Sequence, residues 1–135
     1  MYEVVSDTDG AYEYVCRTAP VYAASWQAGI VLKRNDAIIA ATLYQEYNGS
    51  NLFMHSAGTP GTNWLTRDYL YWCFHYPFVQ LGCKRATVWV EANNIRSRRF
   101  VARLGWTREA RLTAAGRDGV DVLLYKMMRE DCRYV

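Results

Sequence analysis

The sequence predicts a mixed α/β fold in which a central sheet of about six or seven strands carries helices on its faces.

 Short β-rich runs separated by tight turns fill the first half of the chain and indicate an antiparallel meander. A helical pattern then separates two strand patterns, and a strand–helix–strand crossover of this kind requires a parallel pair. Together these observations predict a mixed sheet, with an antiparallel meander beside a parallel β-α-β unit.

The first half of the chain predicts two helices, the first of them capped, and four strands. Asp7, Thr8 and Asp9 are all suitable N-cap residues, and the helix that they open should end before Pro20. Asn35-Asp36 is typical of a hairpin turn between two strands. The expected elements are a strand over residues 1–5, the capped helix, a short helix over 22–27, and strands over 30–33, 37–47 and 52–57.

The second half alternates helices and strands. Apolar residues recur at the spacing of one helix face at Leu70, Phe74, Phe78 and Leu81. Pro77 lies within this pattern and should kink the helix or end its regular part, because proline lacks the N–H donor and crowds the preceding turn. Gly82 should end it. The elements expected after it are a strand over residues 86–90, a helix over about 95–104 closed by Gly105, and strands over 107–112 and 120–127.

Length and composition favour one domain over residues 1–135, since single cores usually span about 100–200 residues. Apolar residues make up 51% of the chain, which argues against disorder. No apolar run approaches a membrane helix and the first residues do not resemble a signal peptide, so a soluble, cytoplasmic protein is expected. The four cysteines form no CxxC pair, so we expect neither a metal site nor a disulfide framework: Cys16, Cys73, Cys83 and Cys132.

Positive charge is unevenly distributed although the net charge is only +3. Seven arginines crowd one stretch of the sequence: Arg96, Arg98, Arg99, Arg103, Arg108, Arg111 and Arg117. A basic patch attracts anions, either nucleic acid or the phosphates of a nucleotide cofactor. The number of arginines does not choose between these partners.

A motif begins where the strand over residues 86–90 meets the next helix. Asn94, Ser97 and Leu104-Gly105-Trp106 form the pattern N-x-x-S-x-x-x-x-x-x-L-G-aromatic. Arg108-Glu109-Ala110-Arg111-Leu112 follows, and then Asp118-Gly119, Asp121 and Tyr125. Over residues 81–129 this resembles the GNAT superfamily of N-acetyltransferases, and most closely the branch that acetylates the N-termini of ribosomal proteins. The short chain is also similar to phage-encoded members.

The resemblance implies an enzyme that transfers an acetyl group from acetyl-coenzyme A to a primary amine, by direct attack in a ternary complex. A protein N-terminus or a lysine is the favoured acceptor, and the protein would be a monomer or a homodimer. The strands over 52–57 and 86–90 should splay apart at their ends and hold the pantetheine arm. A backbone N–H between Met54 and Ser56 should then polarise the thioester carbonyl.

The usual phosphate-binding loop of the superfamily, R/Q-x-x-G-x-G/A, is absent. A loop before a helix N-terminus can still bind phosphate, because its backbone N–H groups are free and the helix dipole favours negative charge. Gly58 and Gly61 would allow close approach of the cofactor, Thr62 or Thr66 could cap the helix, and Arg67 could pair with phosphate.

Other candidate residues lie at the strand–helix corner and on the facing strand. Asn94 should cap the helix by accepting from the N–H of Ser97, and the resemblance also places it beside the pantetheine. Ser97 is expected to protonate the leaving thiolate, since Val101 stands where many relatives carry a tyrosine. Arg96, Arg98 and Arg99 could bind the cofactor phosphates.

Two residues compete for the role of general base. Glu91 ends the strand, and partial burial there would raise its proton affinity. It could instead be a solvated acid paired with Arg96 or Arg98. His55 is the rival, because an imidazole accepts protons near neutral pH. Acidic residues in 7–13 and Glu46 could attract a basic acceptor.

Two further functions are compatible with the sequence. The arginines and interleaved aromatic residues could form a nucleic-acid-binding domain, through phosphate contacts and base stacking. The altered phosphate loop is also compatible with an inactive domain that binds an acyl-coenzyme A but has lost catalysis. A nucleic-acid-binding domain would not need Asn94 and Ser97 at a strand–helix junction, so we favour the acetyltransferase.

Overall fold

The structure is a computed structural model that describes residues 1–135, and it contains one seven-stranded sheet in the order β1-β2-β3-β4-β5-β7-β6. Its strands are β1 (Tyr2–Ser6), β2 (Gln27–Arg34), β3 (Ala37–Gln45), β4 (Phe53–Gly58), β5 (Arg85–Glu91), β6 (Thr107–Leu112) and β7 (Val122–Met128). Its α-helices are α1 (Thr8–Cys16), α2 (Arg67–His75) and α3 (Ile95–Leu104). Only β4 and β5 pair in parallel, which confirms the predicted mixed sheet.

Local polar residues set the ends of these elements much as the sequence predicts. Asp7 caps α1 by accepting from the N–H of Gly10, and Asn94 caps α3 by accepting from the N–H of Ser97. Gly105 ends α3 in the left-handed conformation, with φ of 102°. Asn35 and Asp36 both have positive φ, 52° and 70°, as the tight hairpin between β2 and β3 requires.

The short helix expected over residues 22–27 is wrong, because residues 20–24 have no regular structure and β2 already begins at Gln27. Two glutamine side chains explain the difference. The Tyr22 carbonyl accepts from Gln45 Nε2 at 2.9 Å, and the Ala24 N–H donates to Gln27 Oε1 at 3.2 Å. Backbone groups that a helix would pair internally are therefore held by the sheet, and residues 17–26 form a loop along it.

Pro77 changes the helix type and does not end the helix. After α2, residues 76–80 continue as a π-helix, in which the Leu81 N–H donates to the Tyr76 carbonyl at 2.9 Å. Single π-turns of this kind are a common way to absorb an irregularity in a helix. The wider turn keeps Phe78 buried and stacked against Phe74, with ring centroids 6.2 Å apart.

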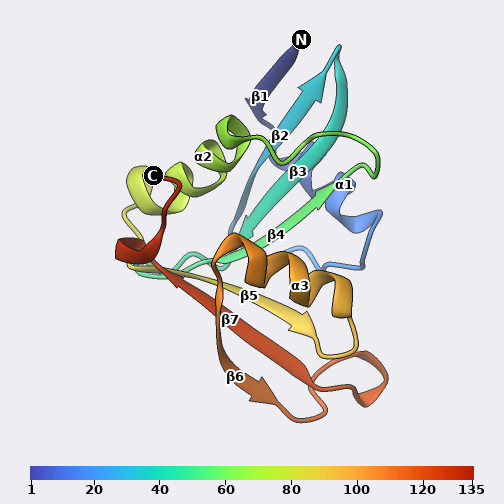
Figure 1. Ribbon diagram of the computed structural model, residues 1–135, viewed down its shortest axis with the longest axis vertical. Coiled ribbons are helices and arrows are strands. Elements are labelled where there is room, and N and C mark those ends of the chain that lie inside the picture. Colours follow the sequence, from blue (N-terminus) through green and yellow to red (C-terminus); the bar gives the residue numbers. More distant parts are fainter.

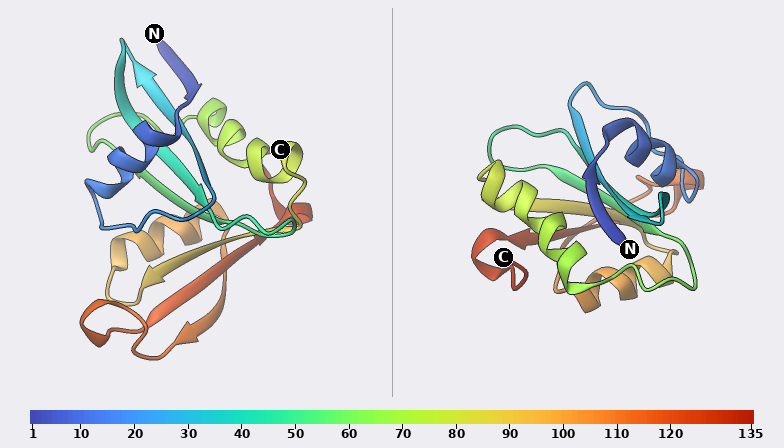
Figure 2. Two further views of the ribbon diagram at one scale, coloured as in Figure 1. Left: turned by 180° about the vertical axis from the view of Figure 1, so that it is seen from behind. Right: turned by 90° about the horizontal axis from the view of Figure 1, so that it is seen from above.

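The helices cover the two faces of the sheet unequally. Helix α1 packs against β2, β3 and β4 on one face, whereas α2 and α3 lie on the other (Figure 2). The larger core lies beneath α2 and α3, and a smaller one lies beneath α1. On the face of α1, the sheet region of β5, β7 and β6 has no helix above it, and Trp89 is 44% exposed there. No helix combines the length and apolar character needed to cross a membrane.

Candidate functional site

The strands β4 and β5 diverge from a common start. They pair at a single position, Phe53 with Thr87, and then separate toward their C-terminal ends (Figure 1). The closed end is held by the Thr87 N–H, which donates to the Leu52 carbonyl at 2.9 Å, and by the Thr87 hydroxyl, which donates to Asn51 Oδ1 at 2.7 Å. The expected divergence of two parallel neighbours is therefore present, and we call this region the splay.

Backbone groups of both strands face the splay without a strand partner. The N–H of Thr59 donates to Ile39 in β3, so by the alternation along a strand Ser56 and Gly58 turn their backbone groups away from β3, toward β5. On β5, the same alternation turns the backbone groups of Trp89 toward β4. Met54 lies next to the single parallel pair at the closed end, so Ser56 carries the first free N–H along β4.

Asn94 and Ser97 lie at the corner between β5 and α3. The Asn94 side chain accepts from the Ser97 N–H at 3.2 Å, which leaves the Ser97 hydroxyl without a hydrogen-bond partner in the protein. Ser97 is half-buried and lies one turn before Val101, which is buried in the core, so it belongs to the inner face of α3. The predicted cap is confirmed, and the serine is placed with a free hydroxyl.

Glu91 differs from the expectation. Its carboxylate accepts from the backbone N–H of Arg117 at 2.6 Å and from Arg117 Nη2 at 2.9 Å. These hydrogen bonds lower the pKa of Glu91, whereas burial was expected to raise its proton affinity. The partner is also Arg117 of the loop before β7, and neither Arg96 nor Arg98. Glu91 is therefore an ionised carboxylate whose acceptor capacity is already used.

His55 occupies the facing strand, on the face of α1. Burial lowers the pKa of His55 from its ordinary value to about 4, so the imidazole is neutral at pH 7. Its side chain forms no hydrogen bond with the protein. Neither ring nitrogen is fully buried. Phe53 of β4 pairs with Thr87 of β5. His55 and Trp89 each lie two residues further along these strands, so they are the next positions that face each other across the splay.

The loop before α2 is occupied by its own side chains. A Cβ atom on Gly58 would lie 2.0 Å from Cε2 of Trp64, so the close neighbour of this glycine is an indole, at the place where the sequence predicted a cofactor. Trp64 also lies 5.8 Å from Phe100 of α3 and 6.2 Å from Tyr69 of α2, measured between ring centroids. Trp64 therefore bridges the two helices above the end of β4.

The remaining loop candidates have local roles. Gly61, with φ of 81°, follows Pro60 in a turn that the Thr62 N–H closes onto the Thr59 carbonyl at 3.3 Å. The Thr62 hydroxyl donates to the same carbonyl at 2.6 Å, so Thr62 does not cap α2. Thr66 does, by accepting from the Tyr69 N–H at 3.1 Å.

The arginines of the second half differ in the contacts that they form. Arg67, Arg96, Arg99 and Arg103 are exposed and form no ion pair, on the helices α2 and α3. Arg98 is half-buried and donates to the Ala92 carbonyl at 3.0 Å, so it braces the corner. Arg111 and Arg117 pair with Asp121 and Glu91. The arginine-rich stretch is thus not one free patch.

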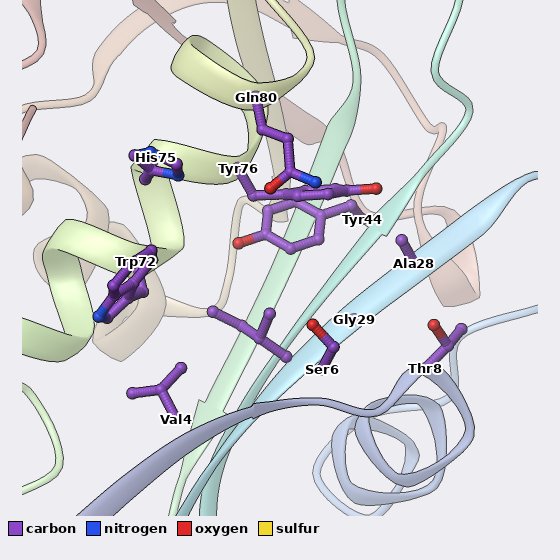
Figure 3. Close-up of a pocket in the computed structure, with 11 residues that line it drawn as sticks. Val4, Ser6, Thr8, Ala28, Gly29, Tyr44, Trp72, His75, Tyr76 and Gln80 are labelled. Atoms are coloured by element: carbon purple, nitrogen blue, oxygen red, sulfur yellow. The ribbon is translucent and has the colours of Figure 1, made fainter.

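A separate cavity of about 410 Å³ lies between the start of the sheet and α2 (Figure 3). Trp72, His75 and Tyr76 line it from the helical side, and Val4 and Ser6 line it from β1. None of the expected site residues borders this cavity.

Sequence reasoning did not assign site roles to Trp64 or to Arg117. Trp64 comes shortly after Gly58 and Gly61. A glycine followed by a large aromatic residue was the available signal that the indole packs against the glycine backbone. Arg117 reaches Glu91 because β7 inserts between β5 and β6, which places the loop before β7 at the end of β5. No local pattern indicates this strand order.

The sequence matches no protein-family model and no curated protein. Solved structures do resemble the chain. The spermidine/spermine N-acetyltransferase SpeG from Vibrio cholerae has a TM-score of 0.77 at 11% identity, over 96% of this chain and 93% of that chain. A mutant form of the same protein reaches 0.79 at 11% identity, over 99% and 96% of the two chains. A probable acetyltransferase has a TM-score of 0.64 at 12% identity, over 77% and 63%. The chain therefore has the GNAT fold that its sequence motif predicts.

Proposed function

We propose that the chain is an acetyl-coenzyme A-dependent N-acetyltransferase that acts on a primary amine, with a protein N-terminus or a lysine as the favoured acceptor. The observation that carries the proposal is the splay, where backbone groups of β4 face β5 without a strand partner, and where β5 leads into the Asn94–Ser97 corner. A regular parallel sheet would satisfy these groups with a neighbouring strand, and an extended pantetheine arm can pair with them instead. We expect the reaction to take place in the cytoplasm, where acetyl-coenzyme A is supplied.

The residues of the α2 and α3 face fit the phosphates of the cosubstrate. Arg67 and Arg99 carry guanidinium groups without an ion pair, and Thr66 orders the N-terminus of α2, where backbone N–H groups favour an anion. Trp64 occupies the space between α2 and α3, so we expect its indole to shift or to stack when the arm enters. Gly61 and Thr62 shape the loop that carries Trp64.

Transfer requires a carbonyl that is polarised, an amine that has lost a proton, and a thiolate that can leave. We assign the first role to the Ser56 N–H, since it is the first free donor along β4. We assign the role of proton acceptor to His55, directly or through water, because its imidazole forms no hydrogen bond with the protein while both carboxylate oxygens of Glu91 accept from Arg117. Ser97 donates a hydrogen bond to the leaving thiolate with its free hydroxyl. Glu91 has a structural role in this mechanism, because its contacts with Arg117 hold the loop before β7.

Thermal unfolding with acetyl-coenzyme A tests the proposal. A ligand at about 100 times its dissociation constant should add roughly 2.7 kcal/mol to the free energy of unfolding. Ser56→Pro removes the N–H that faces the splay and should abolish this stabilisation, whereas Ser56→Ala keeps the N–H and should retain it. Circular dichroism of both variants checks that they fold. No stabilisation of the unaltered chain at millimolar acetyl-coenzyme A would refute the proposal.

Turnover separates an active enzyme from a domain that only binds the cosubstrate. The release of free thiol in the presence of an amine-bearing peptide should exceed the release without it. Binding without this difference would support the inactive domain. The nucleic-acid alternative is weaker, because Arg111 and Arg117 are neutralised by ion pairs.

A further inference from the structure

The two faces of the sheet beside the splay differ in the elements that cover them. The arginines without ion pairs that suit the cosubstrate phosphates, Arg67 and Arg99, belong to the helices α2 and α3. These helices cover one face, whereas β5, β7 and β6 are uncovered on the other. An amine can therefore reach the splay from the uncovered face, between the loop of residues 17–26 and the loop of residues 113–121. We call this region the acceptor mouth.

Aromatic side chains are exposed at the acceptor mouth. Trp89 is 44% exposed, and Leu124 of β7 lies beside it in the sheet register. Tyr22, in the loop of residues 17–26, is 91% exposed and lies within electrostatic range of Arg117. Trp89 and Tyr22 are both exposed, so their rings offer apolar area to a ligand and not to the core.

The acids of β5 and β6, and Asp121 just before β7, are already paired. Glu91 binds Arg117, and Glu109 binds both Arg85 and Lys126. Asp121 binds Arg111. Residues 17–26 contain no acid, and Asp118 is the one acid of residues 113–121 outside an ion pair. Several ammonium groups on one ligand would need several free carboxylates. The two loops of the acceptor mouth provide one free carboxylate, that of Asp118.

We propose that the acceptor is a primary amine attached close to an aromatic or aliphatic group, which packs against Trp89, and that it is not a polyamine. This inference rests on the proposed N-acetyltransferase function. It separates the chain from the spermidine acetyltransferases that share its fold. Burial of an apolar group against Trp89 provides the binding free energy that ion pairing cannot. A small arylalkylamine and a peptide whose N-terminal residue is apolar both have this chemistry.

Initial rates with three amines at equal concentration test the inference: phenethylamine, a pentapeptide that begins with leucine, and spermidine. We expect kcat/KM for spermidine to be at least about tenfold below that of the better apolar amine. The ratio between phenethylamine and the peptide identifies the source of the amine. Equal or faster acetylation of spermidine would overturn the inference and leave the acetyltransferase proposal intact. Loss of thioester with none of the three, together with no stabilisation by acetyl-coenzyme A, would overturn both.

Variants of one residue connect the selectivity to Trp89. Trp89→Ala should lower kcat/KM for the apolar amine about tenfold, and should lower kcat/KM for spermidine much less, without raising the KM for acetyl-coenzyme A. Trp89→Phe should retain most of the activity. Tyr71→Ala is the matched control, since it removes an aromatic side chain of similar exposure, 39%, from α2 on the opposite face. A loss of the same size for both amines in Trp89→Ala would contradict the proposed contact.

Discussion

Ser97 and Asn94 divide two tasks at the same corner. The backbone N–H of Ser97 completes the cap of α3, and its side-chain hydroxyl stays free. Asn94 is exposed and serves the helix with its side-chain oxygen. Removing the hydroxyl should therefore affect chemistry without affecting the cap.

We predict that Ser97→Ala lowers kcat about ten- to a hundredfold, because the leaving thiolate loses its hydrogen-bond donor. The dissociation constant for acetyl-coenzyme A and the thermal midpoint should be nearly unchanged. Steady-state kinetics and calorimetric titration measure these quantities. Ser97→Thr keeps a hydroxyl and should recover part of the rate. An unchanged kcat in Ser97→Ala would remove the serine from this role.

His55 should make the stability of the fold depend on pH. Its pKa falls from about 6.5 in the unfolded chain to about 4 in the fold, so the folded protein excludes a proton that the unfolded chain binds. Above pH 6.5 the titration of His55 does not reduce the free energy of unfolding. As the pH falls toward 4, it reduces the free energy of unfolding by up to roughly 3 kcal/mol. Urea unfolding at pH 7 and pH 5 should show this loss, and His55→Gln should show a smaller one. Equal pH dependence in both proteins would contradict the assignment.

At the scale of elements, α2 and α3 combine core packing with a charged outer surface. Val101 is buried, whereas Arg96, Arg99 and Arg103 are exposed on the same helix. The left-handed Gly105 ends α3 one residue before the buried Trp106. The helix is thus held by its inner face and caps, and its outer arginines are free to bind an anion.

We predict that Arg67→Gln and Arg99→Gln each raise the KM for acetyl-coenzyme A about three- to tenfold, since a guanidinium–phosphate contact is lost. Their kcat should change little. Arg17→Gln is the matched control, because Arg17 is also exposed but lies just after α1 and pairs with Glu13. Rate measurements over a range of acetyl-coenzyme A separate KM from kcat. An equal rise of KM in the control would indicate a nonspecific charge effect.

The molecule as a whole favours direct transfer between two bound substrates. The buried cysteines are unsuited to carry an acetyl group, and burial raises the pKa of Cys73 to about 12. The splay opens between two faces of the sheet, so both substrates can be bound together.

Initial-rate kinetics should therefore give intersecting double-reciprocal lines, as expected for a ternary complex. Product formation should also require both substrates, with no acetyl group retained by the protein after incubation with acetyl-coenzyme A alone. Mass spectrometry of the intact chain checks the second point. Parallel lines together with an acetylated cysteine would contradict direct transfer.

Much of the architecture follows from local sequence. The α3 boundaries, the Asn94 cap and the Gly105 end were predictable, because caps and left-handed glycines act within one turn of the chain. The parallel pair of β4 and β5 followed from the crossover between them. The helix over residues 22–27 was mispredicted, since Gln45, which is distant in sequence, holds the backbone of that segment.

The sequence by itself determined the order of elements, the helix caps and the motif at the β5–α3 corner, because these depend on neighbours along the chain. The tertiary structure alone decided the state of the site. Insertion of β7 beside β5 brings Arg117 to Glu91 and lowers its pKa, and the packing of Trp64 over Gly58 fills the space above β4. Contacts between residues far apart in sequence set these charges and spaces, and no local pattern specifies them.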